Sequence, residues 1–152
     1  MSNKLIRKAL EQRLAAMPAV PTIAYENVNF VPVDNVPFVA INFMFAQPDD
    51  LGFRDSPFIQ NGYLQLTLFY PVNKGPGAAE SKAEDFRNWF ARSFSFAVDG
   101  ATVVINHTPE ISGGSVEDGR YVIRVYIRFR ATVETDLSNL TNLQINGPAN
   151  QW

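Results

Sequence analysis

The sequence has no cysteine and a single histidine among its 152 residues. A chain without cysteine forms no disulfide and performs no thiol chemistry, and one histidine removes most zinc-binding arrangements. The longest apolar runs are well short of the roughly 20 residues that a membrane-spanning helix needs. The formal net charge of -2 and the pI near 5.3 argue against a protein that binds by neutralising many phosphates. Any contact with nucleic acid would therefore be local.

The composition is that of an ordinary globular domain. Hydrophobic residues make up 46% and charged residues 18% of the chain, and a chain of this length buries roughly two thirds of its unfolded surface on folding. Residues 1–17 carry charge throughout and lack the uninterrupted apolar centre of a secretory signal. We therefore expect one domain that stays in the cytoplasm where it is made.

Two segments show the spacing of apolar side chains that is typical of amphipathic helices. The first covers residues 3–16. Arg13 falls inside its apolar arc, where it either extends its charge to solvent or marks the end of the helix. The second covers residues 78–95, with an apolar arc that continues through Phe94 and acidic side chains toward its N-terminal half, as the helix dipole favours.

Alternating apolar and polar residues predict the strands. The strongest pattern is 120–133, in which one face is apolar and the other carries arginine. Segment 38–45 is apolar on both faces, which predicts a strand covered on both sides for much of its length. Asp99-Gly100 indicates a hairpin-type turn. Further strands are predicted at 22–30, 63–71 and 101–106, and long loops at 46–62 and 107–119.

The order of these elements predicts an α+β fold. Strands outnumber helices and several are joined by short turns, which favours a mostly antiparallel or mixed sheet with two helices packed on one face. We expect a single domain over residues 1–134. Asn, Ser, Thr, Gly and Pro together make up half of residues 135–152, which predicts a C-terminal tail that is flexible or is ordered by a partner.

The loop at residues 74–77 resembles a phosphate-binding turn, because its glycines precede the N-terminus of a predicted helix. A P-loop, however, places its Lys and Ser or Thr directly after the last glycine, whereas Lys74 comes before the glycines here. A connector is the better interpretation.

The remaining polar residues do not form a recognisable catalytic or metal pattern. No serine, cysteine or paired carboxylate stands at a catalytic spacing from His107, which is better explained as a turn residue before Pro109. Asp49, Asp50 and Asp55 lack the alternate ligand positions and the distal glutamate of a calcium loop, so a solvated acidic loop is favoured. We expect no catalytic residue, metal or cofactor.

The arginine face of the 120–133 strand is the most informative polar feature. A row of like charges on one strand face is costly unless water, carboxylates or phosphates lie opposite. Two interpretations stay open: the face is solvated, or it meets an acidic neighbour, which would be another copy of the protein or DNA. The face consists of Arg120, Arg124, Arg128 and Arg130.

Four segments together suggest a known family. They are AQPDDLGF at 46–53, NGYLQLTLFYPVNKGPGAAESKAEDFRNWF at 61–90, GATVVIN at 100–106 and YVIRVYIRFRATV at 121–133. In this order and spacing, the chain resembles the tail-terminator-like proteins of long-tailed phages and prophages, over roughly residues 3–134. No single segment is diagnostic; their order carries the resemblance.

The resemblance implies a structural virion protein and no enzymatic activity. Proteins of that family are small α+β subunits that form a hexameric ring with copies of themselves on the end of a finished tail tube. The ring stops tube polymerisation and presents a surface to head-completion or neck proteins. The implied location is the head-proximal end of the virion tail, after assembly in the host bacterial cytoplasm, with no membrane partner.

A ring that closes by rotation needs two different complementary surfaces on each subunit. We expect the acidic loop and the arginine face to form such a pair, or alternatively the arginines to line the ring lumen and contact DNA non-specifically. The competing functions are another ring-forming neck, connector or baseplate component, and a small-molecule-binding domain. The candidate partner-binding residues are Asp49, Asp50, Arg54, Asp55, Lys74, Arg120, Arg124, Arg128 and Arg130.

Overall fold

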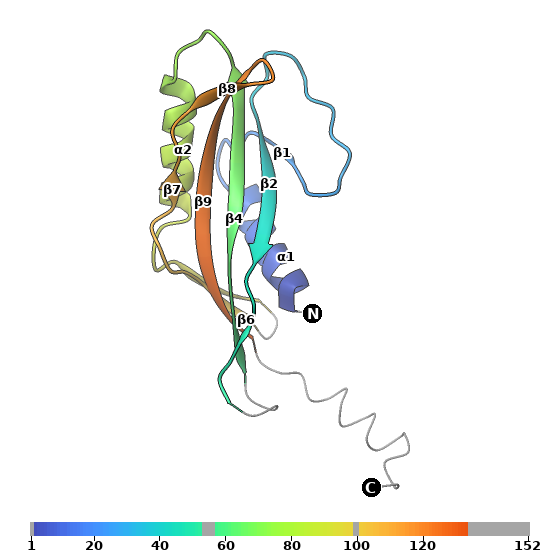
Figure 1. Ribbon diagram of the computed structural model, residues 1–152, viewed down its shortest axis with the longest axis vertical. Helices are drawn as coiled ribbons and strands as arrows, with labels where there is room; N and C mark the ends of the chain where they lie inside the picture. Colours follow the sequence, from blue (N-terminus) through green and yellow to red (C-terminus); the bar gives the residue numbers. More distant parts are fainter. Residues whose placement is uncertain (1, 53–56, 99–100, 134–152) are drawn as a thin grey trace, which may run out of the picture.

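In the computed structural model, residues 2–52, 57–98 and 101–133 are described and form two helices and one nine-stranded sheet (Figure 1). The elements follow the order α1 (Ser2–Ala15), β1 (Thr22–Ala24), β2 (Phe38–Phe45), β3 (Asp49–Asp50), β4 (Phe58–Pro71), α2 (Gly77–Trp89), β5 (Ser95–Val98), β6 (Ala101–Ile105), β7 (Glu110–Ile111), β8 (Ser115–Glu117) and β9 (Arg120–Val133).

The centre of the sheet is the antiparallel pair of β4 and β9, which stay in register from Phe58 opposite Val133 to Pro71 opposite Arg120. The strand order is β1-β2-β4-β9-β6-β5, with β3 also beside β4 and with β7 and β8 beside β9. All pairs are antiparallel except β1 with β2. The predicted α+β class with a mixed, mostly antiparallel sheet is confirmed.

Both helices pack on the same face of the sheet, as predicted. Helix α1 buries Ile6, Leu10 and Leu14, and α2 buries Ala79, Ala83 and Phe86. Each fully buried Leu, Ile or Phe contributes about 1.5–3 kcal/mol relative to an exposed one. Neither of these two helices is long and apolar enough to span a membrane. The sheet contributes alternate residues to the same core: Val39, Ile41, Phe43, Leu64, Leu66, Leu68, Ile123, Val125 and Ile127.

Two predicted strands, 38–45 and 120–133, are confirmed as β2 and β9 with the same bounds. The predicted strand 22–30 is reduced to the three residues of β1. The predicted loops 46–62 and 107–119 are wrong in part, since β3 and the start of β4 fall in the first, and β7 and β8 in the second. All four of these segments pair with a neighbour in the long β4–β9 ladder, whose backbone groups would otherwise lack partners.

Strand β2 is covered on both sides only at its beginning, so that expectation was half right. The Phe38 ring packs between those of Phe30 and Phe69, at centroid distances of 4.9 and 4.6 Å. Asn42 and Met44, further along the same face, are exposed, and Met44 is 54% exposed. The sheet face opposite the helices is therefore open along the second half of β2.

Helix α2 ends at Trp89, six residues before the predicted end. Ser93 adopts a left-handed φ of 72°, and the Ser93 N–H donates to the Ile105 carbonyl at 2.7 Å, so the chain turns back to pair with β6 as β5. Arg13 lies at this turn, with its guanidinium 3.7 Å from the Trp89 ring centroid and 4.0 Å from that of Phe94. Arg13 also donates a hydrogen bond to the Trp89 carbonyl at 2.8 Å. Because the C-terminus of a helix carries a partial negative charge, this is a favourable place for a cation.

Gly62 occupies a position in β4 that has no room for a side chain. A Cβ built there would lie 2.7 Å from Cζ of Phe129 and closer still to the Met44 carbonyl oxygen. The Phe129 ring also contacts Phe45 edge-on, with centroids 5.9 Å apart. The Phe129 ring therefore packs against the backbone of β4, which requires a glycine at position 62.

Replacing Gly62 with alanine is expected to lower the free energy of unfolding by about 1–3 kcal/mol, because the new methyl group must displace the Phe129 ring or the β2 backbone. Thermal and urea unfolding measure the change. Gly113→Ala is the matched control, since a Cβ at Gly113 meets no heavy atom within 4 Å. Equal stability of the two variants would contradict the packing argument.

Candidate interaction surface

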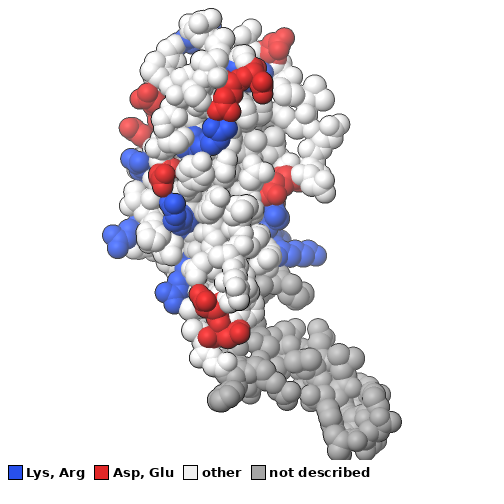
Figure 2. All heavy atoms as spheres, viewed as in Figure 1, with Lys and Arg blue, Asp and Glu red and all other residues white. Residues whose placement is uncertain are grey.

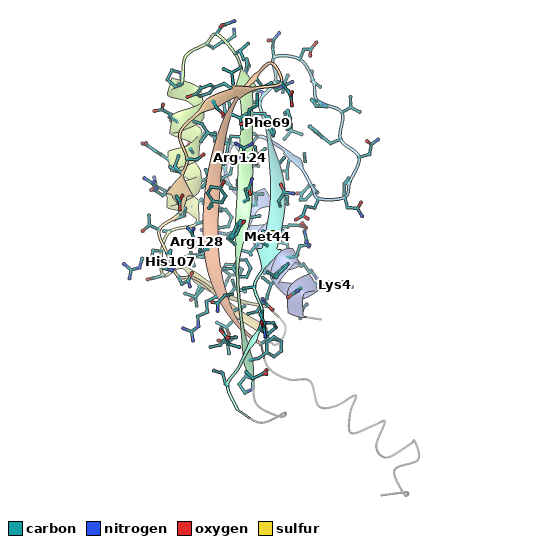
Figure 3. The ribbon with its side chains drawn as sticks, in the orientation of Figure 1. Lys4, Met44, Phe69, His107, Arg124 and Arg128 are labelled. Carbon is teal, nitrogen blue, oxygen red and sulfur yellow. The ribbon has the colours of Figure 1, made fainter. Side chains whose placement is uncertain are left out.

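The four arginines of β9 share the sheet face that points away from the helices. Arg120 and Arg124 are half-buried, whereas Arg128 and Arg130 are exposed. Figure 3 shows Arg124 and Arg128 along β9, with His107 beside Arg128. The four arginines therefore lie on one face of the sheet, as predicted, but they differ in exposure and in the groups that they contact.

Arg124 forms the best-organised polar contact on this face. Its two Nη groups donate to the two carboxylate oxygens of Glu117, both at 2.9 Å, and the Ser115 hydroxyl donates to the same carboxylate at 2.9 Å. These hydrogen bonds, that from Arg124 first, lower the pKa of Glu117 to about 2. Glu117 precedes an Asp118-Gly119 turn in which both residues have positive φ, the geometry of a two-residue hairpin.

Two other arginines of the row also have partners in the chain. Arg120 donates to the carbonyls of Val33 at 2.8 Å and Val36 at 3.0 Å. The Nη1 of Arg128 lies 3.3 Å from a carboxylate oxygen of Glu110, in a pair whose side chains are about half exposed. Within the described residues, Arg130 forms no ion pair and no side-chain hydrogen bond.

The groups that face the arginines therefore come largely from the same chain. Glu110 and Glu117 belong to β7 and β8, the segment that the sequence predicted as a loop. In Figure 2, basic and acidic side chains are interspersed on this face rather than gathered in one basic band. Arg128 and Arg130 remain the members of the row that are exposed for a contact with another molecule.

The predicted acidic residues lie elsewhere on the sheet. Asp49 and Asp50 form β3, which pairs with the first residues of β4, and both are exposed. Arg54 and Asp55 lie outside the described residues. Since β3 is on the side of β4 away from β9, Asp49 and Asp50 form no ion pair with the four arginines within the described part of the chain.

Lys74 lies at the opposite end of β4, in the exposed turn to α2. Asn73 and Gly75 have φ values of 62° and 73°, which reverse the chain between the strand and the helix. The 74–77 segment is thus a tight connector, as the sequence indicated.

His107 lines an open cleft of about 580 Å³ together with Arg92, Thr108, Glu110 and Arg128. The structure brings the histidine near two arginines that sequence spacing did not connect with it. Among the described residues, no group of three or more His, Asp or Glu side chains is placed to hold a metal ion.

Glu26 protects an exposed strand edge and was missed by the sequence analysis. Strand β1 pairs with β2 only as far as Ala40, and the carboxylate of Glu26 accepts the N–H of Phe43 further along that edge. Arg7 holds Glu26 at 3.0 Å and lies 4.4 Å from the Phe43 ring centroid. Such covering of a free edge discourages unwanted strand pairing.

The sequence predicts a turn at Asp34-Asn35, which the structure confirms, but the exposed valines of the loop between β1 and β2 were missed. Residues 27–37, here called the valine loop, project from the sheet edge in Figure 1. Seven large apolar side chains are exposed among the described residues, and four of them belong to this loop. The signal in the sequence was four valines within the nine residues 28–36, with Asp34 as the single charged residue among them. The four are Val28, Val31, Val33 and Val36, exposed by 42 to 76%.

Comparison with known proteins gives a family and a fold. A family model described as phage tail terminator protein matches residues 5–129. The comparison with curated proteins returned no match. One solved structure aligns over 90% of this chain and 98% of its own chain, with a TM-score of 0.66 and 24% identity. At that identity the likeness shows a shared fold.

The carboxyl group of Glu117 is expected to titrate near pH 2 in the folded protein, and Arg124→Gln is expected to raise the midpoint toward the ordinary 4.5. Because the folded-state pKa is below the unfolded one, the stabilisation is complete above about pH 4.5 and is lost as the pH falls toward 2. Carboxyl-carbon NMR measures both midpoints. An unchanged midpoint in Arg124→Gln would show that Arg124 is not the main cause of the lowered pKa of Glu117.

Proposed function

The match over residues 5–129 places the chain in the phage tail terminator family, and we propose that it caps the tail tube of a long-tailed phage or prophage as a ring of its own copies. Members of this family are structural proteins of the phage tail. The proposed ring is a hexamer that stops tube polymerisation and provides the surface to which the head-completion or neck protein binds. The family match is the single observation that carries this proposal.

The distribution of surface charge supports a ring in which neighbours meet head to tail. Exposed Asp49 and Asp50 lie on the β2–β3 side of the β4–β9 pair, whereas Arg128 and Arg130 lie toward β6 and β7. A ring contact joins two different surfaces of the same subunit. We propose that the acidic segment 49–55 of one subunit faces Arg128 and Arg130 of the next, while Arg120 and Arg124 mainly hold their own subunit together.

The proposed location follows from this role. The ring occupies the head-proximal end of the tail in the virion, after its subunits have assembled in the host cytoplasm. Its partners are other copies of the chain, the tail tube protein and the neck protein. The alternative partner of the exposed arginines is DNA in the ring lumen. In that case, we expect the tails to retain DNA less well as the salt concentration rises.

Deletion of the coding sequence from the phage or prophage is expected to yield tail tubes of irregular length that do not join heads, because nothing stops polymerisation. Electron microscopy of lysates measures the length distribution, and expression of the intact chain in the deletion strain is the control. Tails of uniform length on normal particles in the deletion strain would end the proposal.

Reversing both exposed arginines, Arg128→Glu with Arg130→Glu, is expected to weaken ring assembly, since like charges placed together across an interface cost several kcal/mol. Combining this change with Asp49→Lys and Asp50→Lys is expected to restore assembly in part. Light scattering and tail length measure the effect.

Lys4→Glu is the matched control for this charge reversal, because Lys4 is an exposed cation on α1. Failure of the aspartate reversals to rescue, together with salt-dependent loss of DNA from tails, would assign the two arginines to the lumen instead.

A further inference from the structure

The valine loop is an exposed apolar surface held in a fixed shape. Two of its carbonyls accept hydrogen bonds from Arg120, and the Val36 N–H donates to the Val33 carbonyl at 3.3 Å. Asn27 and Asn35 adopt left-handed φ values of 55° and 61° at its turns. A preorganised apolar loop loses little conformational entropy when it binds, and such exposed patches mark interaction sites.

An apolar cleft lies at the same end of the sheet, between the turn after β4 and the β8–β9 hairpin. Its volume is about 420 Å³. Val116, which is another of the seven exposed apolar side chains, lines this cleft and is 68% exposed. The lining of the apolar cleft contains no charged side chain and consists of Pro71, Val72, Asn73, Gly75, Pro76, Val116, Gly119 and Tyr121.

The two surfaces carry opposite charges at their margins. Asp34 is the only charged residue within 27–37, and Lys74 is the only one within 71–77, the segment that borders the cleft. Both side chains are exposed. The valine loop, with its acidic Asp34, and the apolar cleft, with the basic Lys74 at its border, are therefore complementary in charge as well as in polarity.

The loop of one molecule does not fill its own cleft, because the two lie on opposite faces of the sheet. Val116 pairs directly with Tyr121, whose face of β9 is the helix side. Arg120, which holds the valine loop, belongs to the alternate face. The occupant of the cleft must therefore come from another molecule.

We propose that the valine loop of one subunit inserts into the apolar cleft of the next copy of this chain, with Asp34 beside the neighbour's Lys74. This inference rests on the proposed ring and names its main apolar contact. A projection and a recess on one subunit make a head-to-tail contact, which closes into a ring when the rotation between neighbours allows it.

Cysteine cross-linking tests the contact without background, since the chain has no cysteine. Val31→Cys and Val116→Cys are produced as separate variants, one of them tagged, and expressed together in the deletion strain so that tails are present. A disulfide between the two variants can only join different molecules. On mild oxidation, we expect it to form on the order of a hundredfold faster than a random collision product, because contact raises the effective concentration.

Met44→Cys mixed with Val116→Cys is the matched control, because Met44 is also an exposed apolar residue but lies on the open sheet face of β2, outside both proposed contacts. Uniform tails without preferential Val31–Val116 cross-linking would overturn this inference and leave the proposed function intact. Irregular tails in cells that express the intact chain would instead count against the proposed function.

Val31→Asp provides a second readout if a cysteine variant assembles poorly. It is expected to fold normally by circular dichroism, since Val31 is 76% exposed, and to lose uniform tail length. Val31→Asp tails of normal length would also overturn the contact.

Discussion

The long antiparallel pair of β4 and β9 is the constraint on which the rest of the structure depends. Because the two strands match from Phe58–Val133 to Pro71–Arg120, one face of the sheet is apolar over most of its length and receives both helices. The outer edge of each long strand must also find hydrogen-bond partners. On the β4 side these are β2 and β3, and on the β9 side they are β6, β7 and β8. The short strands thus complete the central pair.

This arrangement gives the subunit two unlike sides. The β2–β3 side carries the valine loop and Asp49–Asp50, whereas the opposite side carries Arg128 and Arg130; the apolar cleft lies between the turn after β4 and the β8–β9 hairpin. Each of the two proposed contacts therefore joins two different surfaces of neighbouring subunits. A chain whose acidic surfaces, at Asp34 and Asp49–Asp50, differ in place from its basic surfaces, at Lys74 and Arg128–Arg130, is suited to head-to-tail assembly.

Much of the fold could be predicted because β9 and the first helix have strong periodicity over eight or more residues, and because β2 is an almost entirely apolar run of eight residues. The short strands could not, since two or three residues such as Glu110–Ile111 show no period. The Asp118-Gly119 turn had a recognisable hairpin sequence, yet the alternation before it was too brief to reveal a strand. Helix α2 was overextended because Phe94 continues the helical arc by position, while tertiary pairing with β6 decides its conformation. The Asp99-Gly100 prediction lies outside the described residues, as does the 135–152 tail.

Only one property of the candidate surface could be predicted from the sequence, namely which side chains of β9 share a face. Alternation assigns the four arginines to one face, but it does not tell what covers that face, and the Glu117 and Glu110 partners depend on tertiary pairing of β7 and β8. The covered arginines, Arg124 and Arg120, hold the hairpin and the valine loop in place, so in the proposed interface they act by fixing the shape of these segments. Exposed rim charges contribute mainly to orientation and association rate, whereas buried apolar anchors supply most of the binding free energy. The valines that sequence reasoning passed over should therefore outweigh the arginines that it singled out.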